Sequence, residues 1–271
     1  MWSSSEQLEL LSQYGDVILM DSTFKVNSQG FPLFTLLVTD AFGIGQPVAH
    51  CLLQREDIPS ISEFLVWLKE GLNKAIFVID KDSAEIGAIR NTFPGSSIFL
   101  CRFHMLKAFL EELNKHKFPE ERRSKIYGIF ENMVKCSSQD EYDVLVKEFE
   151  YAGSELSYYF NCNWNTVSMI PMFAGYTRIG KLHLDNHTTN RLECFHAKIK
   201  KVINSSKIKM SFLVEKLLSI AIIRSVETKH SYFNATMKTP IKIPNELSDA
   251  VAKVSSYALK NGEATILHEI Q

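Results

Sequence analysis

Two short apolar runs, Asp16-Val17-Ile18-Leu19-Met20-Asp21 and Ala75-Ile76-Phe77-Val78-Ile79-Asp80, each end in an aspartate. Continuous apolar runs of this length predict buried β-strands, so Asp21 and Asp80 are expected at strand ends. A third carboxylate, Glu193, opens a basic helical pattern much later in the chain. Two aspartates on strands and a glutamate on a helix form the oxygen ligand set that a two-metal phosphoryl-transfer site requires.

The pattern around these runs predicts an α/β fold with the element order βββαβαβα. Apolar alternation and turn residues place the strands at about 17–21, 33–39, 47–53, 75–80 and 97–100. Short Gly-containing turns join the first three strands, which indicates an antiparallel meander. The helical connections that follow make the first, fourth and fifth strands parallel, in a mixed five-stranded sheet.

Helix starts are predicted from capping boxes, in which a Ser, Thr, Asp or Asn is followed three residues later by Glu or Gln. These pairs are Ser3 with Glu6, Ser60 with Glu63, Asp82 with Glu85, and Asn190 with Glu193. The helix that Ser60 would begin is expected to stop at Gly71.

The predicted organisation has four parts. Residues 1–116 form the first part of the core, and 117–180 form an all-helical insertion, because their apolar residues repeat at helical spacing. Residues 181–235 carry the Glu193 helix and complete the core. Residues 236–271 form a C-terminal helical tail, with an amphipathic helix at about 247–259.

Composition limits the classes of function. The chain has 271 residues, 45% of them hydrophobic, which is enough for a full core. Its 30 basic and 31 acidic residues leave a net charge of −1, so a nucleic-acid site must be local. Five widely spaced cysteines predict free thiols in a reducing compartment, and no apolar stretch is long enough to span a bilayer. Cytosol or nucleus is therefore expected, with no membrane partner.

The chain resembles the Mutator-like transposase domain, a member of the RNase H-like superfamily, and its relatives in SWIM-zinc-finger proteins. The resemblance spans about residues 16–201. Its matching residues are Asp21-Ser22-Thr23-Phe24-Lys25, Pro32-Leu33, Trp67, Ile79-Asp80, Phe93-Pro94, Cys101-Arg102-Phe103-His104 and Thr189-Asn190-Arg191-Leu192-Glu193.

The resemblance implies a DDE site in a nuclear protein that acts on DNA. Asp21, Asp80 and Glu193 would be both the catalytic residues and the ligands of two Mg²⁺ or Mn²⁺ ions, with Cys101 and His104 beside them. The sequence lacks the SWIM-type Cys-x-Cys and Cys-x-His cluster and a zinc module before Asp21. A catalytic core alone, or a fragment of a longer protein, is expected, and a homo-oligomer is left open.

Each carboxylate also has an ordinary structural explanation. Asp21 could merely end a strand and begin a turn. Asp80 competes with Asp82, but Asp82 has a ready role as a helix cap. Glu193 has the strongest rival explanation, because with Asn190 it would form a capping box that needs no metal.

Two further groups of residues have alternatives. Cys101 and His104 have a metal-ligand spacing, and zinc would need more ligands, which Cys194 and His196 could supply if the Glu193 helix lies alongside. Arg191, Lys198, Lys200 and Lys201 are expected to contact the DNA backbone, although such a run is also typical of a solvated helix face.

Three functional hypotheses follow. The first is an active transposase core that cleaves DNA and joins the freed 3′-OH to a target. The second is a domesticated, catalytically silent relative that binds DNA or protein in the nucleus. The third is a metal-dependent nuclease without transposition.

Overall fold

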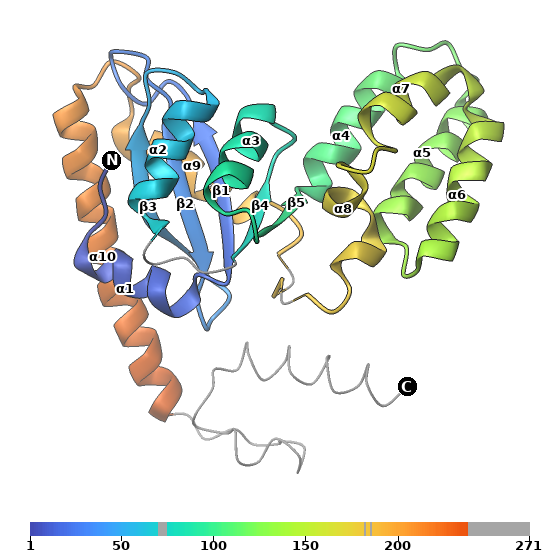
Figure 1. Cartoon of the computed structure of the whole chain (residues 1–271). Coiled ribbons are helices and arrows are strands. Elements are labelled where there is room, and N and C mark those ends of the chain that lie inside the picture. Colours follow the sequence, from blue (N-terminus) through green and yellow to red (C-terminus); the bar gives the residue numbers. More distant parts are fainter. Residues whose placement is uncertain (70–74, 182, 185, 238–271) are drawn as a thin grey trace.

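A five-stranded mixed sheet forms the centre of the protein (Figure 1). The computed structural model describes residues 1–69, 75–181, 183–184 and 186–237. The sheet order is β3-β2-β1-β4-β5. Its first three strands pair antiparallel, whereas β1, β4 and β5 are parallel, so the predicted α/β topology is confirmed. The strands are β1 (Val17–Thr23), β2 (Leu33–Thr39), β3 (Gly45–Leu52), β4 (Ile76–Ile79) and β5 (Ser97–Leu100).

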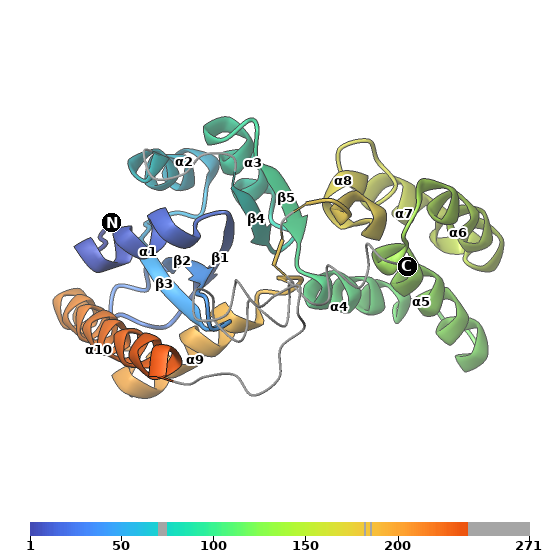
Figure 2. The same cartoon turned by 90° about the horizontal axis from the view of Figure 1, so that it is seen from below.

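Helices bury both faces of the sheet (Figure 2). One face packs against α1 (Ser5–Tyr14), α2 (Ile58–Trp67) and α3 (Ser83–Thr92). The other face packs against α9 (Asn190–Ile203) and α10 (Met210–Met237). Burial on two faces explains why the central strands are continuously apolar rather than alternating. Across the described ranges, none of the helices has both the length and the apolar character needed to cross a bilayer.

A separate helical lobe lies beyond β5, at the right of Figure 1. Phe109 of the first lobe helix stacks on Phe130 of the second with ring centroids 4.0 Å apart, so the helix directly after β5 packs into the lobe. The all-helical insertion expected after residue 116 is present. The lobe consists of α4 (Arg102–Leu113), α5 (Glu120–Lys135), α6 (Gln139–Ala152), α7 (Ser157–Asn163), α8 (Ile170–Phe173) and two short 3-10 helices (Ser154–Leu156 and Gly175–Arg178).

The predicted caps of α1 and α2 are wrong by one and three residues, respectively. Ser4, not Ser3, caps α1 in a capping box with Gln7, because the Ser3 hydroxyl instead donates to the carbonyl of Val48 at 2.6 Å. Asp57, not Ser60, caps α2, and its carboxylate accepts from the Ser60 backbone N–H at 3.0 Å. The predicted stop at Gly71 and the helix at 247–259 lie outside the described residues.

Gly175 tests how tightly the lobe packs. A Cβ at Gly175 would lie 2.5 Å from the Cys136 carbonyl oxygen and 2.6 Å from the Lys135 carbonyl carbon, so the backbone must shift. We expect Gly175→Ala to lower the free energy of unfolding by about 1–3 kcal/mol. Gly128→Ala is the control, because no atom lies within 4 Å of its Cβ position in α5 and alanine favours the helix by up to about 1 kcal/mol. Urea unfolding measures both, and equal stabilities would contradict the prediction.

Candidate acidic metal site

Asp21 and Asp80 lie beside each other because β1 and β4 are neighbouring parallel strands. The register pairs Leu19 with Val78, and two more residues along both strands bring Asp21 next to Asp80. Neighbouring strands lie about 4.8 Å apart, and residues in register point to the same face of the sheet. That face is the one covered by α9, since Leu19 and Val78 pack with Leu192 of that helix.

Helix α9 brings Glu193 to the same place. Its apolar residues Leu192, Phe195 and Ile199 are buried against the sheet, which fixes the rotation of the helix about its axis. Glu193 then lies near His104, the residue that contacts Asp80: Glu193 Oε1 is 3.6 Å from His104 Nε2. One turn further, His196 Nδ1 lies 3.5 Å from Asp21 Oδ2. A single helix therefore contacts the surroundings of both aspartates.

The capping explanation of Glu193 is wrong. The residue before the helix is Thr189, not Asn190, and its side chain makes no capping hydrogen bond. In a capping box, the glutamate is the third residue of the helix. Because α9 begins at Asn190 itself, Glu193 is its fourth residue and is not in the capping position. Its carboxylate is left available to the acidic site.

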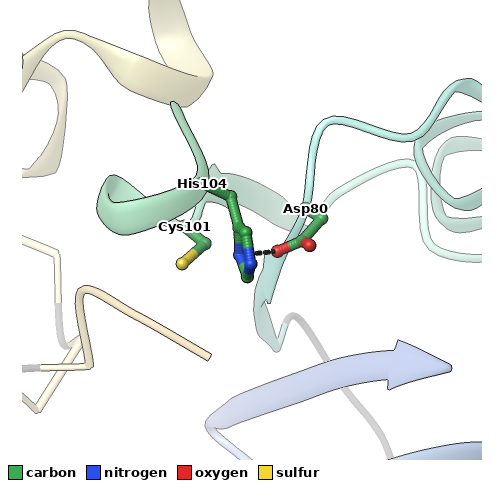
Figure 3. A group of neighbouring side chains, drawn as sticks. All are labelled: Asp80, Cys101 and His104. Atoms are coloured by element: carbon green, nitrogen blue, oxygen red, sulfur yellow. Dashed lines mark ion pairs between the residues drawn. The ribbon is translucent and has the colours of Figure 1, made fainter. Parts of the chain in front are cut away.

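His104 contacts two of the three carboxylates. Its Nδ1 lies 2.7 Å from Asp80 Oδ1 (Figure 3). Its other ring nitrogen lies 3.6 Å from Glu193 Oε1. Hydrogen bonds to Asp80 and then to Cys101 raise the pKa of His104 to about 10, against the effect of its partial burial. The imidazole is therefore protonated at neutral pH and holds the two carboxylates with its positive charge.

Cys101 lies behind His104 and is fully buried. The ligand atoms of Asp80, Cys101 and His104 all lie within 4.8 Å of one another, which makes them a group that could hold a metal ion. Burial raises the pKa of the Cys101 thiol, but hydrogen bonds from His104 and Thr189 outweigh it, so the pKa is lowered overall. The sulfur accepts from both the backbone N–H and the hydroxyl of Thr189 at 3.4 Å.

Thr189 lies at the centre of this group, and sequence analysis gave it no role. Its fully buried Oγ1 is 3.5 Å from both Asp80 Oδ1 and His104 Nδ1, and 3.4 Å from Glu193 Oε1. The hydroxyl has one proton to donate, so Asp80, Cys101 and Glu193 are alternative acceptors, whereas the contact with the His104 imidazolium is one in which the Thr189 oxygen accepts. Thr189 thus spaces the side chains around it.

Two further titratable residues near the site, Glu85 and His196, were missed or misassigned from the sequence. Glu85 does not complete a capping box with Asp82, which caps α3 alone. Glu85 is instead 5% exposed, and its Oε2 has no hydrogen-bond partner among the residues that the structure describes. Burial raises the pKa of Glu85 well above its usual value, and Asp21, Asp82 and Asp80 raise it further. Its surroundings therefore favour the neutral form of Glu85 beneath the site.

A signal for these residues exists in helical periodicity. Glu85 precedes the buried Ala88 and Ile89 by three and four residues, so it falls on the apolar face of α3. His196 falls likewise on the buried face of α9, three residues before Ile199. A polar residue on an apolar helix face predicts a buried polar group, but the pattern does not name its partner.

The alternative zinc set is not brought together. Cys194 is exposed on α9, and His196 points to Asp21 rather than to Cys101. Within the described parts of the chain, Asp80, Cys101 and His104 are the group of potential ligands that converges.

The four predicted DNA contacts differ in their surroundings. Arg191 is partly buried and donates to the Gly43 carbonyl at 3.1 Å and to Asn186 Oδ1 at 2.9 Å. The lysines are exposed. Lys198 and Lys201 border a groove against α10, whereas Lys200 follows Glu193 by seven residues and so shares its side of the helix.

This sheet order, with carboxylates on its two central parallel strands, defines an RNase H-like fold. Residues 1–99 match the family model of the RNaseH-like domain of zinc finger SWIM domain-containing proteins 1/3, so the resemblance to that class of domain is confirmed. The match includes Asp21 and Asp80 and ends before Cys101. A search among curated proteins finds no match.

His50, beneath α9, makes stability depend on pH. It is fully buried between Thr35, whose Oγ1 lies 3.1 Å from its Nδ1, and the ring of Phe195. Burial, together with the nearby His196, lowers the pKa of His50 from 6.5 to about 3. Below pH 6.5 the unfolded chain binds a proton that the native protein does not, so stability falls with falling pH until about pH 3.

We expect His50 to contribute a loss of about 1.4 kcal/mol per pH unit between pH 6 and pH 4. Urea unfolding at several pH values should show a shallower slope for His50→Gln than for the wild type. The slopes of stability against pH are compared, rather than the stabilities themselves, because the substitution also changes stability at every pH. Identical slopes would mean that His50 is protonated in the native protein.

Proposed function

We propose that the protein is a DDE-type enzyme that cleaves DNA phosphodiester bonds with two divalent cations and transfers the freed strand. The observation that carries the proposal is that neighbouring parallel strands place Asp21 beside Asp80, while the helix that covers them brings Glu193 to 3.6 Å from His104, the residue that holds Asp80. Rigid elements deliver all three carboxylates to one face of the sheet, which is what such chemistry requires.

The residues fit Mg²⁺ or Mn²⁺ better than a softer metal. The side chains of Asp21, Asp80 and Glu193 are 21%, 32% and 40% exposed, so their oxygens are accessible. The one soft donor, Cys101, is buried and already accepts from Thr189. Hard cations prefer such oxygen ligands. When bound, a pair of these ions activates the attacking water or hydroxyl and stabilises the leaving oxygen.

The neighbouring side chains position the carboxylates. The His104 imidazolium holds Asp80 at 2.7 Å and faces Glu193, while His196 orients Asp21 from the other side. Hydrogen bonding of ligand carboxylates by surrounding groups is a common way to fix their rotamers. Asp21, Asp80 and Glu193 are therefore expected to keep their arrangement before any ion binds.

DNA is the substrate we propose, in a nuclear protein. Lys200 supports this, because it lies about 10 Å along the helix from Glu193 on the same side, a distance suited to a neighbouring phosphate. The net charge of −1 gives no general attraction to DNA, so such local cations must supply it.

A specific observation favours a second candidate, a silent module that binds DNA or protein. The His104 imidazolium already compensates the charge of Asp80 and Glu193. Carboxylates that are paired in this way are stable without a metal, as a retained scaffold requires.

Metal titration separates the two candidates. For an active site, Mn²⁺ at ten times its dissociation constant should raise the melting temperature by about 3–5 °C through mass action. Asp80→Asn should lose most of this shift, because it removes a charged ligand. Glu193→Gln should also lose most of the shift, because it likewise removes a charged ligand. Glu193 does not cap α9, so no change in helix capping complicates this comparison. Differential scanning fluorimetry measures the shift.

Glu150→Gln is the matched control, because it is an exposed glutamate on α6 in the lobe. It should respond to Mn²⁺ as the wild type does. A labelled DNA substrate then tests the reaction itself: Mn²⁺-dependent nicking that Asp80→Asn abolishes supports the enzyme, and nicking without joined products indicates a nuclease. A wild type without metal response or nicking would leave the silent module as the function.

Lys200 can be tested apart from catalysis. If it meets a phosphate, Lys200→Ala should weaken DNA binding and reduce the slope of log K against log salt concentration by about one. Lys201→Ala is the matched control, because Lys201 is the next residue, is turned about 100° around the helix from Lys200 and lines the groove against α10. Fluorescence anisotropy at several salt concentrations measures both slopes. Equal effects of the two substitutions would contradict the proposal that DNA binds on the side of α9 that carries Lys200 and Glu193.

A further inference from the structure

Helix α10 has two different faces. Its inner face is attached to the sheet: Leu213 and Leu217 are buried, the Arg224 guanidinium donates to the Gly45 carbonyl, and Gln46 donates to Thr228 Oγ1 at 3.0 Å. The helix lies at the edge of the molecule, beside α9 and α1 (Figure 2). Its outer face is turned away from those anchoring residues.

The outer face carries an apolar stripe with a charge at each end. Leu218, Ile222 and Val226 are 38%, 66% and 62% exposed, and they follow one another at intervals of four residues. Glu215 lies three residues before Leu218, and Lys229 lies three residues after Val226; both are exposed. Residues at this spacing share one side of a helix. We call these five residues the α10 stripe.

The α10 stripe is symmetric about Ile222. Leu218 and Val226 lie four residues to either side of it, and Glu215 and Lys229 lie seven residues to either side. The residues four positions from Ile222 are therefore both aliphatic, and the residues seven positions from it carry opposite charges.

We propose that the α10 stripe binds the α10 stripe of a second copy of this chain, with the two helices antiparallel across a two-fold axis at Ile222. In this arrangement Ile222 meets its own counterpart, and each Leu218 meets the Val226 of the other copy. Each Glu215 meets the Lys229 of the other copy, so both ends form ion pairs. The surface is self-complementary, as a two-fold interface must be.

The charges decide the orientation and the occupant. A parallel pair would place Glu215 against Glu215 and Lys229 against Lys229, which is repulsive. An anionic lipid surface or a nucleic acid would be attracted by Lys229 but repelled by Glu215, so it would satisfy one charged end of the stripe and not the other. A second antiparallel copy satisfies both charged ends while covering the exposed aliphatic side chains.

The mass of the full chain in solution tests the proposal. Sedimentation equilibrium should give about twice the protomer mass of 30.9 kDa at micromolar concentration, and dissociation on dilution. Ile222→Asp places two carboxylates at the axis and should weaken the dimer by about a hundredfold or more. Val144→Asp is the matched control, because Val144 is 63% exposed on α6 and is expected to leave the dimer unchanged.

A charge exchange tests the register. Glu215→Lys and Lys229→Glu should each weaken the dimer about tenfold, and the double variant should restore it, because the pairs are re-formed with reversed charge. Restored dimerisation also shows that the single variants fold. Their folding is checked independently by circular dichroism.

Cross-linking tests the axis. In a chain with Cys162→Ser and Cys194→Ser, which removes the exposed thiols, Ile222→Cys should form an intermolecular disulfide under mild oxidation, whereas Val144→Cys should not. A monomer at all concentrations, or a dimer that Ile222→Asp leaves intact, would overturn the proposal. So would a monomer in which the thiol of Ile222→Cys is protected from alkylation, since another part of the chain would then cover the α10 stripe.

Discussion

The parallel pairing of β1 with β4 is the constraint on which the acidic site depends. Its register places Asp21 beside Asp80 through the pairing of the backbones alone. The pairing is maintained by burial, because helices cover both faces of these strands and exclude water from their backbone hydrogen bonds. Carboxylates at this point are therefore brought together by forces that act on their apolar neighbours. The repulsion between them is balanced by hydrophobic packing elsewhere and by the cation of His104.

Helix α9 turns this strand pair into a three-carboxylate site. Its buried stripe sets the rotation of the helix, and Glu193 and His196 follow from that rotation because they lie three residues apart. A helix rotated by one residue, about 100°, would turn both side chains away together. Arg191 resists such a rotation, since its bond to Gly43 ties the start of the helix to the loop after β2 and its bond to Asn186 ties it to the segment before the helix. A residue expected to contact DNA therefore acts here as an anchor.

The topology could be predicted from the sequence, because strands buried on two faces are continuously apolar and their connections fix their directions. Asp21 and Asp80 follow from the ends of those runs. Cap positions were less predictable, since Ser3 and Ser4 compete locally and the choice depends on the distant Val48 carbonyl. The surroundings of Glu85 and Thr189 could not be predicted either. Their partners come from separate elements, and no local pattern records which side chains the fold will bring together.

The lobe is joined to the site through residues next to the carboxylates themselves. Lys81 directly follows Asp80, and its ammonium lies 4.4 Å from the ring centre of the buried Trp164 in the lobe. On the other side, Cys101 follows β5 and immediately precedes α4, the first lobe helix, which also carries His104. A shift of the lobe relative to the sheet would therefore move Lys81 and His104 together, on both sides of Asp80. Because the Asp80 carboxylate is held by His104 at 2.7 Å, its orientation depends on how the lobe packs, although every lobe residue beyond α4 is distant from it in the sequence.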